Sequence, residues 1–582
     1  MNLLAKYLVT SFFLVIATTY LLGQRVNIPK EGIPRITEMG HNEQVWTVAT
    51  DSANLLYTGT GGGLYQRDGN NINHLYSRGA IRTIVKDAAE QIFVGGANTF
   101  GYIGLDSLGR KIYVPLNEDF ENPGTIEYIV FHKDLVYFLF NNGFYRYNKS
   151  TQSVDLIEDT GLVKTGFEHI DNFLFCSTDS GIFKIQDNDS IAYVFPDLSI
   201  EKTVPADNQS VWAFSNQNGC YLFRPDGSMQ PVDIPIGEII KENKFYDVKR
   251  LNESLIAFLF LDYGLILTNN DLEILTHWDA SSGLSNEIYD VATDRAGNLF
   301  VSSNDRLYVL NTAATYSIIN DKLGLEGLVK DAVEMDGKLY AATYKGIYYK
   351  RWGDTTEQNS SYHQFRKMEK SSLYTYDLLK VDEDILVNDY QAIGLIRNDK
   401  YTRLVDKFSQ LGFVIFSPDS SKVFSTGDDG KEIVVLEKQG KNWRVVSRIP
   451  TGELYTQFNI TSSVIWDHKR NWFWMGTAYN ELYSFKIDST FSQIVDVRKY
   501  GEEDGLNGKV SVRKIDNEYL FLTSTVIHKY DDSSGKFVPD ERLGKNAIDL
   551  YQLKKIKDDY WFASRSIGRG VYKQNGNSFE KK

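Results

Sequence analysis

The stretch Gly283–Leu310, GLSNEIYDVATDRAGNLFVSSNDRLYVL, contains three short strands and two turns. The turns are Asp294-Arg295-Ala296-Gly297 and Asn304-Asp305, because Asp and Asn bond their own backbone and Gly adopts positive φ. β-Branched, aliphatic and aromatic residues predict the strands at 288–292, 299–301 and 307–310. Such an antiparallel meander is too small to bury its own faces, so it requires similar neighbours.

Similar segments recur along the chain. Val291-Ala292-Thr293-Asp294 has a counterpart in Val48-Ala49-Thr50-Asp51, and the strand and hairpin that follow recur as well. The central strand is an aliphatic or aromatic pair followed by small residues, and it occurs thirteen times with centres 36 to 50 residues apart. The centres are Tyr57, Phe93, Tyr137, Phe175, Trp212, Ile256, Phe300, Tyr340, Leu386, Phe424, Trp474, Phe521 and Trp561.

Most of these centres are followed by a hairpin strand of the type Gly-aliphatic-aromatic. Examples are Gly143-Phe144-Tyr145, Gly181-Ile182-Phe183 and Gly346-Ile347-Tyr348. A repeat of roughly 40 residues with four short strands is typical of a β-propeller. The sequence therefore predicts an all-β fold of two tandem β-propellers, each with about seven blades of four antiparallel strands.

Several short motifs resemble one known repeat. The L-W-I-G-T core of the two-component regulator propeller repeat is similar to Leu56-Tyr57-Thr58-Gly59-Thr60, Ile92-Phe93-Val94-Gly95-Gly96 and Trp474-Met475-Gly476-Thr477. Asp294–Asn298 resembles the D-x-x-G-N turn before that core, and Gly283–Asn286 and Gly505–Gly508 resemble its G-L-S/P-N lead-in. These repeats build the periplasmic sensor region of bacterial hybrid two-component systems. The resemblance covers residues 26–582 and implies a sensor fold.

The repeats divide the chain into three parts. We predict a signal peptide at 1–24, a first propeller of seven repeats at 25–310 and a second propeller of six repeats at 311–582. Lys6 before the apolar run Tyr7–Leu22 is the pattern of an export signal, although an uncleaved N-terminal anchor stays open. An outer strand at Ile33–Met39 is expected to close the first ring on its last blade.

The second ring differs from the family pattern in its number of repeats. The family shows seven where six are visible, and the β-sandwich, membrane helix and kinase that follow in the family are not recognisable in this sequence. A six-bladed ring, a degenerate seventh blade and a truncated sensor all stay open. The polar insertion Gly353–Ser361 is expected to be an exposed loop.

Composition limits the class of partner. The formal net charge is −13, and 36 Tyr, 33 Phe and 9 Trp accompany only 12 Pro. An acidic chain is a poor match for nucleic acid or anionic lipid, so neither is expected as a partner. The many aromatics fit strand-rich blades with aromatic cores.

Motifs with possible chemistry all have a simpler structural interpretation. Gly59-Thr60-Gly61-Gly62-Gly63 has neither the Lys-Ser/Thr nor the helix of a phosphate loop. No histidine pair has zinc spacing among His41, His74, His132, His169, His277, His363, His468 and His528. Three acidic clusters match hairpin turns better than calcium loops, namely Asp187-Asn188-Asp189, Asp428-Asp429-Gly430 and Asp531-Asp532-Ser533-Ser534-Gly535.

The cysteines and four of the tryptophans also have an ordinary packing interpretation. Cys176 and Cys220 fit two small buried residues better than a disulfide. Four tryptophans fall outside the repeat's central position: Trp46, Trp278, Trp352 and Trp443. Trp278 could stack on a sugar at an opening, but ordinary packing is favoured. The sequence therefore yields no catalytic or metal-binding residue, no cofactor and no identified ligand-binding residue.

Three functions are compatible with the sequence. The first is an extracytoplasmic sensor or binding module without its own kinase, periplasmic or secreted, and the resemblance implies that it binds a small molecule or an oligosaccharide. A membrane-bound signalling partner and a homodimer stay open for it. The second is a secreted propeller enzyme acting on polysaccharide, although no catalytic motif is found and enzyme activity is not favoured. The third is a structural propeller for protein interaction.

Overall fold

The computed structural model describes residues 26–581 with gaps. The longer gaps are 159–162, 186–190, 353–363, 407–413, 416–420 and 541–549, and gaps of one to three residues separate other segments. The predicted signal peptide, the insertion at 353–361 and the cluster at 187–189 lie outside the described residues. The described part divides into two compact units, one ending at Leu323 and the other beginning at Gly324.

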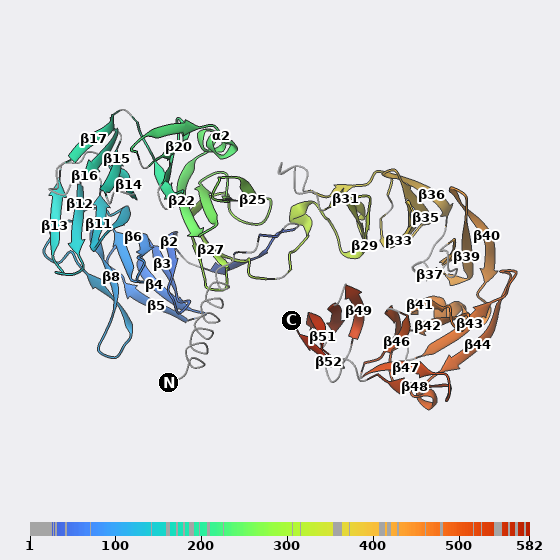
Figure 1. The fold of residues 1–582 in the computed structure, drawn as a ribbon. Coiled ribbons are helices and arrows are strands. Elements are labelled where there is room, and N and C mark those ends of the chain that lie inside the picture. The colour runs from blue at the N-terminus through green and yellow to red at the C-terminus, as the bar shows by residue number, and fades with distance from the viewer. Residues whose placement is uncertain are drawn as a thin grey trace, which may run out of the picture. The chain divides into compact units, whose positions relative to one another are not determined.

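Among the described residues, the first unit contains seven four-stranded antiparallel sheets (Figure 1). Its strands are β1 (Arg35–Gly40), β2 (Val45–Thr50), β3 (Leu56–Thr60), β4 (Gly63–Asp68), β5 (Asn71–Tyr76), β6 (Ile81–Lys86), β7 (Ile92–Gly96), β8 (Thr99–Leu105), β9 (Lys111–Pro115), β10 (Tyr128–His132), β11 (Leu135–Phe140), β12 (Gly143–Asn148), β13 (Val154–Glu158), β14 (Val163–His169), β15 (Phe173–Thr178), β16 (Gly181–Ile185), β17 (Ile191–Pro196), β18 (Lys202–Pro205), β19 (Val211–Ser215), β20 (Gly219–Phe223), β21 (Met229–Val232), β22 (Phe245–Asn252), β23 (Leu255–Phe260), β24 (Leu265–Thr268), β25 (Ile274–Trp278), β26 (Ile288–Thr293), β27 (Leu299–Ser303) and β28 (Arg306–Asn311). The helix α2 (Pro235–Glu242) packs on β20, and a 3₁₀ turn, η1, covers Asp321–Leu323.

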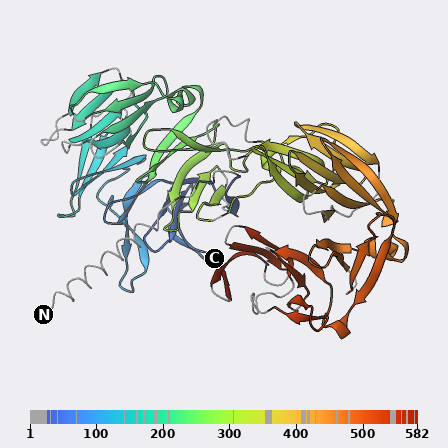
Figure 2. The same ribbon diagram turned by 45° about the vertical axis from the view of Figure 1, so that its right-hand side comes forward.

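The second unit contains six such sheets within the described residues, and they follow one another around a curve (Figure 2). Its strands are β29 (Val329–Met335), β30 (Lys338–Thr343), β31 (Gly346–Arg351), β32 (Arg366–Lys367), β33 (Thr375–Val381), β34 (Asp384–Asp389), β35 (Ala392–Arg397), β36 (Lys400–Asp406), β37 (Val414–Ile415), β38 (Lys422–Gly427), β39 (Glu432–Gln439), β40 (Asn442–Pro450), β41 (Thr461–Asp467), β42 (Trp472–Thr477), β43 (Leu482–Ile487), β44 (Ile494–Tyr500), β45 (Ser511–Ile515), β46 (Glu518–Leu522), β47 (Ile527–Asp531), β48 (Lys536–Pro539), β49 (Leu550–Ile556), β50 (Asp559–Ser564), β51 (Gly568–Asn575) and β52 (Ser578–Lys581). Short helical segments are η4 (Gly452–Leu454), α3 (Tyr455–Asn459) and η5 (Glu502–Asp504).

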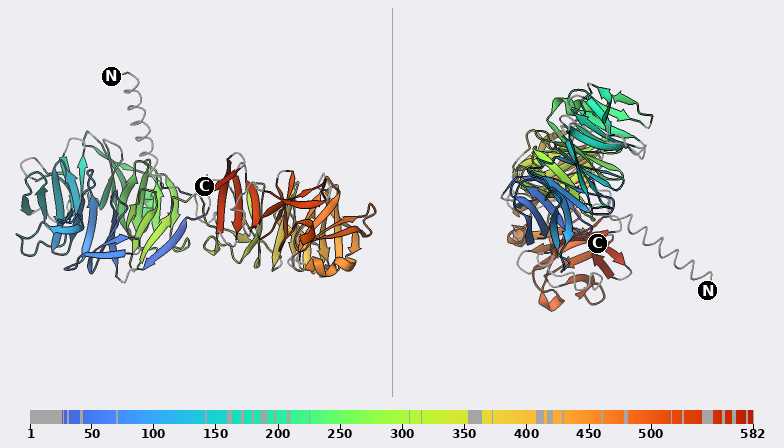
Figure 3. Two further views of the ribbon diagram at one scale, coloured as in Figure 1. Left: turned by 90° about the horizontal axis from the view of Figure 1, so that it is seen from below. Right: turned by 90° about the vertical axis from the view of Figure 1, so that its left-hand side faces the viewer.

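The predicted all-β propeller class is confirmed. All thirteen repeat centres lie in the second strand of a sheet, from Tyr57 in β3 to Trp561 in β50. The stretch Gly283–Leu310 forms β26, β27 and β28, which pair as the predicted meander. Seen edge-on, the strands of each unit run between the two faces of a flat ring or arc (Figure 3).

The first unit is a closed ring. The first strand of each sheet is innermost and contacts the first strand of the next sheet, in the order β2, β6, β10, β14, β18, β22 and β26. Strand β26 then contacts β2, which completes the circle. Because every sheet has the same strand order, the innermost strands all begin at one face of the ring.

The N-terminal strand closes this ring from the outside. Strand β1 pairs antiparallel with β28, from Arg35 opposite Asn311 to Gly40 opposite Arg306, and becomes the fourth strand of the last sheet. The predicted outer strand at Ile33–Met39 is thus confirmed, and an isolated bridge joins Ile33 to Ile318. The last sheet therefore combines strands from both ends of the unit, as a ring that must not open requires.

A recurring hydrogen bond joins neighbouring sheets near the ring axis. A side-chain oxygen early in one innermost strand accepts a backbone N–H from the next innermost strand. The acceptor–donor pairs are Asp290–Val48 at 2.8 Å, Thr47–Ile84 at 3.1 Å, Asp331–Leu378 at 3.0 Å and Ser463–Val512 at 2.8 Å. Each bond satisfies a backbone donor that the sheet ladder does not reach.

Apolar side chains fill the space between adjacent sheets. One cluster joins Tyr57 and Leu64 of the first sheet to Ile84 and Val94 of the second. In the second unit, Trp474 is fully buried and contacts Phe521 of the next sheet at 5.0 Å between ring centroids. The repeat's aromatic position thus supplies the packing between blades. Among the described residues, no helix is long and apolar enough to cross a membrane.

The closing junction gives a first prediction. Asp290 is buried, accepts hydrogen bonds from Thr47 Oγ1 and Val48 N–H, and pairs with Lys249. Substituting Asp290→Ala leaves these donors and the lysine without their acceptor. We expect the free energy of unfolding of the first unit to fall by about 2–4 kcal/mol.

Equilibrium urea unfolding of the full chain measures this loss. The matched control is Asp271→Ala, an exposed aspartate in a turn of the neighbouring sheet, which is expected to change stability by less than about 0.5 kcal/mol. Equal effects of the two substitutions would show that the junction is not held by Asp290.

Candidate functional site

β-Bulges mark the beginning of the innermost strands. In β2, β6, β22 and β26 the pairing register skips one residue, which is Trp46, Arg82, Tyr246 or Tyr289 respectively. A bulged residue lies outside the ladder, and bulges often re-aim a side chain next to a functional site. The first residues of two further innermost strands, Tyr128 of β10 and Lys202 of β18, occupy the same end of the ring.

These six residues form a connected set that we call the inner belt: Trp46, Arg82, Tyr128, Lys202, Tyr246 and Tyr289. The Arg82 guanidinium carbon lies 3.9 Å from the centroid of the Trp46 ring. Trp46 meets Tyr289 edge to face at 5.1 Å, and Tyr289 meets Tyr246 in the same way at 5.4 Å. Six different sheets thus contribute one side chain each to a single aromatic and cationic cluster at the mouth of the ring.

Lys202 extends the inner belt across the ring. Its ammonium nitrogen lies 5.8 Å from the ring centroid of Tyr246 and 4.2 Å from that of Tyr128, and it donates to the Tyr128 hydroxyl at 2.7 Å. Strands β18 and β10 are separated by β14, so this contact spans the position of a whole sheet. The ring is therefore narrow at this mouth.

Electrostatics keep the inner belt rich in hydrogen-bond donors. Burial acts to lower the pKa of Lys202, but Asp247 at 3.5 Å and the two tyrosines outweigh it, and the pKa is raised. Burial and the hydrogen bond to Glu287 raise the pKa of Tyr289 to about 12. Burial and Asp247 also raise the pKa of Tyr246. At neutral pH the lysine is charged and both phenols keep their protons.

Three carboxylates beside the inner belt have structural partners. Asp290 accepts from two donors of β2 and pairs with Lys249, Asp247 pairs with Lys202, and Glu287 accepts from the Tyr289 hydroxyl at 2.6 Å. Such paired carboxylates are poor candidates for the free acid and base of a hydrolase. The arrangement is suited to holding a ligand.

The glycine-rich segment at 59–63 is a hairpin turn that binds a carboxylate of the same chain. Glu43 accepts from Gly62 N–H at 2.8 Å and from Thr60 Oγ1 at 2.7 Å. Gly63 has φ +137°, and a Cβ there would lie 1.8 Å from the Tyr76 carbonyl oxygen. Gly63 is required because the two strands approach each other so closely. The Glu43 carboxylate takes up the hydrogen-bond donors of the turn.

Most histidines of the described residues pack against a tyrosine. His74 stacks on Tyr65 with ring centroids 4.2 Å apart, and His277 stacks on Tyr263 with ring centroids 4.3 Å apart. His468 Nδ1 lies 2.8 Å from the Tyr519 hydroxyl, while His132 and His528 are buried. Within the part of the chain that the structure describes, no group of three His, Cys, Asp or Glu residues could hold a metal ion.

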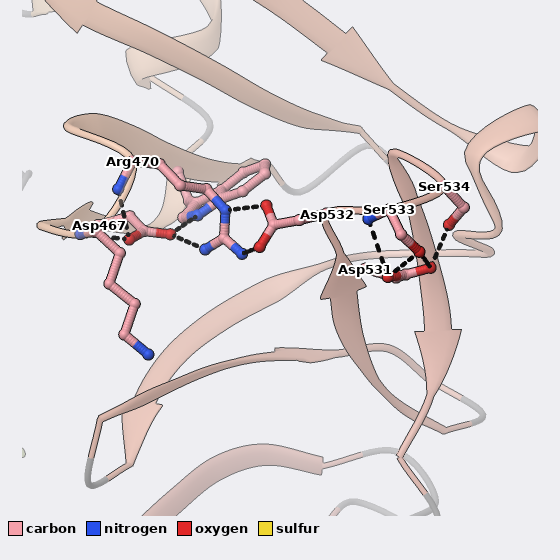
Figure 4. Close-up of polar contacts among 8 residues, drawn as sticks. Asp467, Arg470, Asp531, Asp532, Ser533 and Ser534 are labelled. Carbon is pink, nitrogen blue, oxygen red and sulfur yellow. Dashed lines mark hydrogen bonds and ion pairs between the residues drawn. The ribbon is translucent and has the colours of Figure 1, made fainter.

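The acidic cluster at 531–535 is a turn, as favoured from the sequence (Figure 4). Asp531 accepts from Ser533 N–H at 3.1 Å and from the hydroxyls of Ser533 and Ser534 at 2.8 and 2.6 Å. The neighbouring Asp532 instead binds Arg470, which also donates to the buried Asp467 at 2.6 Å. Asp531 and Asp532 therefore both stabilise hairpin turns. Of the other acidic clusters, residues 428 and 429 lie outside the described residues.

Packing is also confirmed for Trp278 and Cys220. Trp278 is 2% exposed within the core between the last sheets of the first unit. Trp443 is buried and donates to Asp384 at 3.0 Å. Cys220 is a free, buried thiol beside α2, and the Cys176 side chain lies outside the described residues. Trp46 is the tryptophan that reaches the mouth of a ring.

The second unit has a smaller aromatic cluster at the corresponding strand ends. The bulged residues there are Lys330 of β29 and Tyr376 of β33. The Lys330 ammonium nitrogen lies 5.3 Å from the ring centroid of Tyr344. The Tyr344 ring contacts the rings of Tyr374 and Tyr376, with centroids 5.6 and 6.1 Å apart. Tyr374 is 50% exposed and has φ 61°. Within the described residues, this cluster involves the first two sheets of its unit.

Sequence reasoning named Trp46 but missed the inner belt as a site. The signal is a repeated pattern of apolar residue, variable residue, Asp or Thr, and apolar residue. It occurs in Val45-Trp46-Thr47-Val48, Ile81-Arg82-Thr83-Ile84, Phe245-Tyr246-Asp247-Val248 and Ile288-Tyr289-Asp290-Val291. Its second member is the bulged residue, so aligning the repeats at this pattern would have gathered four of the six residues.

The fold and the inner belt define a β-propeller whose first ring gathers aromatic and cationic side chains at one mouth. No family model and no curated protein matches the chain. Its structure is similar to the extracellular domain of a protein assigned as hybrid two-component system BT3049 of B. thetaiotaomicron. The TM-score is 0.67 and the identity 14%, over 93% of this chain and 77% of that one.

Two further solved structures share the architecture at lower similarity. The extracellular domain of BT4673 from the same organism has a TM-score of 0.40 at 12% identity, over 95% of this chain and 83% of that one. PorZ, a surface component of the type-IX secretion system of Porphyromonas gingivalis, has a TM-score of 0.37 at 10% identity, over 94% and 81%. At 14% identity, the similarity to the BT3049 domain confirms the predicted resemblance in fold.

The buried thiol provides a second prediction. Burial raises the pKa of Cys220 to about 12, although Lys241 acts in the opposite direction. In a Cys176→Ser variant, where Cys220 is the only cysteine, we expect almost no reaction with a thiol reagent at pH 8, because the thiolate is the reactive form. Rapid reaction of the folded variant, at the rate seen after urea unfolding, would contradict the described packing.

Proposed function

We propose that this chain is an extracytoplasmic binding module with the role of a sensor, and that its inner belt binds a carbohydrate fragment. The observation that carries the proposal is a continuous set of contacting aromatic and cationic side chains, contributed by six sheets, at one mouth of the ring. The predicted export signal and the structural likeness to the extracellular domain of BT3049 support the location and the role.

The chemistry of the inner belt suits a sugar. A sugar ring has apolar C–H faces that pack on aromatic rings and a rim of hydroxyl groups that needs hydrogen-bond partners. Trp46 and the three tyrosines supply ring faces, and their half-buried or buried positions keep them rigid. The Tyr128 and Tyr246 hydroxyls, Arg82 and Lys202 supply donors around these faces, while the Tyr289 hydroxyl donates to Glu287.

Binding is favoured over catalysis by the state of the carboxylates. Asp247, Asp290 and Glu287 each have a hydrogen-bond or ion-pair partner within the protein. A change of their partners would disturb the ring junction before it produced an acid–base pair. The proposal is therefore recognition without turnover.

Calorimetric titration of the exported chain with a panel of neutral and acidic oligosaccharides tests the proposal. For an oligosaccharide that binds, we expect Trp46→Ala to weaken the affinity about tenfold or more, since one aromatic contact contributes about 1 kcal/mol beyond the area it buries. Tyr246→Ala is expected to act in the same direction.

The matched control is Tyr316→Ala, which removes a tyrosine that is 55% exposed on the first unit. We expect the Tyr316→Ala variant to bind the oligosaccharide with the affinity of the unmodified chain. Melting temperatures of all variants identify any loss of folding. The proposal is wrong if no oligosaccharide binds, or if Trp46→Ala binds as tightly as Tyr316→Ala.

A further inference from the structure

Arg82 differs from Lys202 and Lys249 in having no counter-ion among the residues that the structure describes. Lys202 pairs with Asp247, and Lys249 pairs with Asp290. Among the described residues, Arg82 forms no ion pair, and its buried Nε atom has no hydrogen-bond partner. Its close contact is with the ring of Trp46 at 3.9 Å. The inner belt therefore holds one positive charge that the protein does not neutralise locally.

Stacking on Trp46 prepares this charge for a planar partner. The indole covers one face of the guanidinium and so limits the orientation of its plane, while the N–H groups lie along the edges of that plane. Such an edge matches the two oxygens of a carboxylate or sulfate in a bidentate contact. Because the Nε atom is buried, the two terminal amino groups of Arg82 would make this contact.

The aromatic neighbours place a sugar ring within reach of this group. The ring centroid of Tyr289 lies 5.1 Å from that of Trp46, and the ring centroid of Tyr246 lies 5.4 Å from that of Tyr289. In a uronic acid the carboxylate is attached directly to the sugar ring, and in a sulfated sugar the ester oxygen is attached there. A ring packed on these aromatics could thus place its acid group against Arg82.

The overall charge of the chain makes this local contact decisive. With a formal net charge of −13, the long-range field opposes an anionic ligand. Attraction must come from a short contact in a partly buried site, which salt screens less than exposed charges. An isolated, stacked and unneutralised arginine supplies such a contact.

We propose that Arg82 binds the acid group of an anionic oligosaccharide, either the carboxylate of a uronic acid or a sulfate ester. This proposal rests on the proposed carbohydrate-binding function and names the class of ligand. Arg82 then acts as the residue that distinguishes acidic from neutral sugars, while the aromatic members of the inner belt hold the sugar rings.

The experiment compares each acidic sugar with its neutral counterpart. Short oligogalacturonides and their methyl esters have the same rings and differ in the charge of the carboxyl group, and a sulfated oligosaccharide with its desulfated form provides the second arm. We expect the unmodified chain to bind at least one acidic form tenfold or more tightly than its neutral counterpart. Arg82→Gln is expected to abolish this difference, and Arg82→Lys to reduce it, because lysine keeps the charge and loses the planar fork.

The matched control is Arg295→Gln, which removes an exposed arginine from a turn of the same unit and should leave the preference unchanged. Melting temperatures show whether the variants fold. Equal binding of acidic and neutral forms to the unmodified chain overturns the role of Arg82 and leaves the carbohydrate-binding function standing, as does a preference that persists in Arg82→Gln. Failure of every acidic and neutral form to bind overturns both proposals.

Discussion

The closure of the first ring is the constraint on which the rest of this unit depends. Closure needs β1 from the beginning of the unit as the outer strand of the last sheet, and Asp290 of that sheet bound to Thr47 and Val48 of the first. In a ring of sheets, the innermost strand of each sheet forms backbone hydrogen bonds only within its own sheet. Side-chain oxygens therefore satisfy the N–H groups that face the neighbouring sheet. Because the junction between the last and first sheets uses the same hydrogen bond as Thr47 with Ile84, the closing contact repeats an internal one.

The same local geometry separates structure from function at adjacent positions. In Ile288-Tyr289-Asp290-Val291 the aspartate is fixed by its bonds to the next sheet, while the bulged tyrosine lies outside the ladder and points to other bulged residues. A position free of ladder bonds can carry Trp, Arg or Tyr without cost to pairing. The mouth of the ring thus gathers one such residue from each of several sheets, and the ring closure determines how close they come. The cluster around Tyr344 and Tyr376 shows that the same rule operates in the first two sheets of the second unit.

The sequence predicted the fold well and the site poorly, for physical reasons. Strand positions depend on local patterns such as Leu56-Tyr57-Thr58-Gly59-Thr60, so the thirteen centres and the meander at 283–310 could be identified without coordinates. Even the long-range pairing of β1 followed from the need to close a ring. The inner belt joins residues as far apart as 46 and 289, and a single chain without an alignment does not show which of many aromatics meet. Trp278 illustrates the difficulty, since it shares its residue type with Trp46 and lies in the core.

The central claim is that the ring mouth of the first unit is where the chain meets its ligand. Hydrogen exchange measured by mass spectrometry on the whole chain, with and without a saturating acidic oligosaccharide, tests this claim most directly. The account predicts slower exchange in the segments around 44–48, 81–84, 245–249 and 288–291, with little change in the second unit. Slower exchange confined to the segments around 328–330, 344 and 374–376 would contradict it, because the ligand would then bind the tyrosine cluster of the second unit.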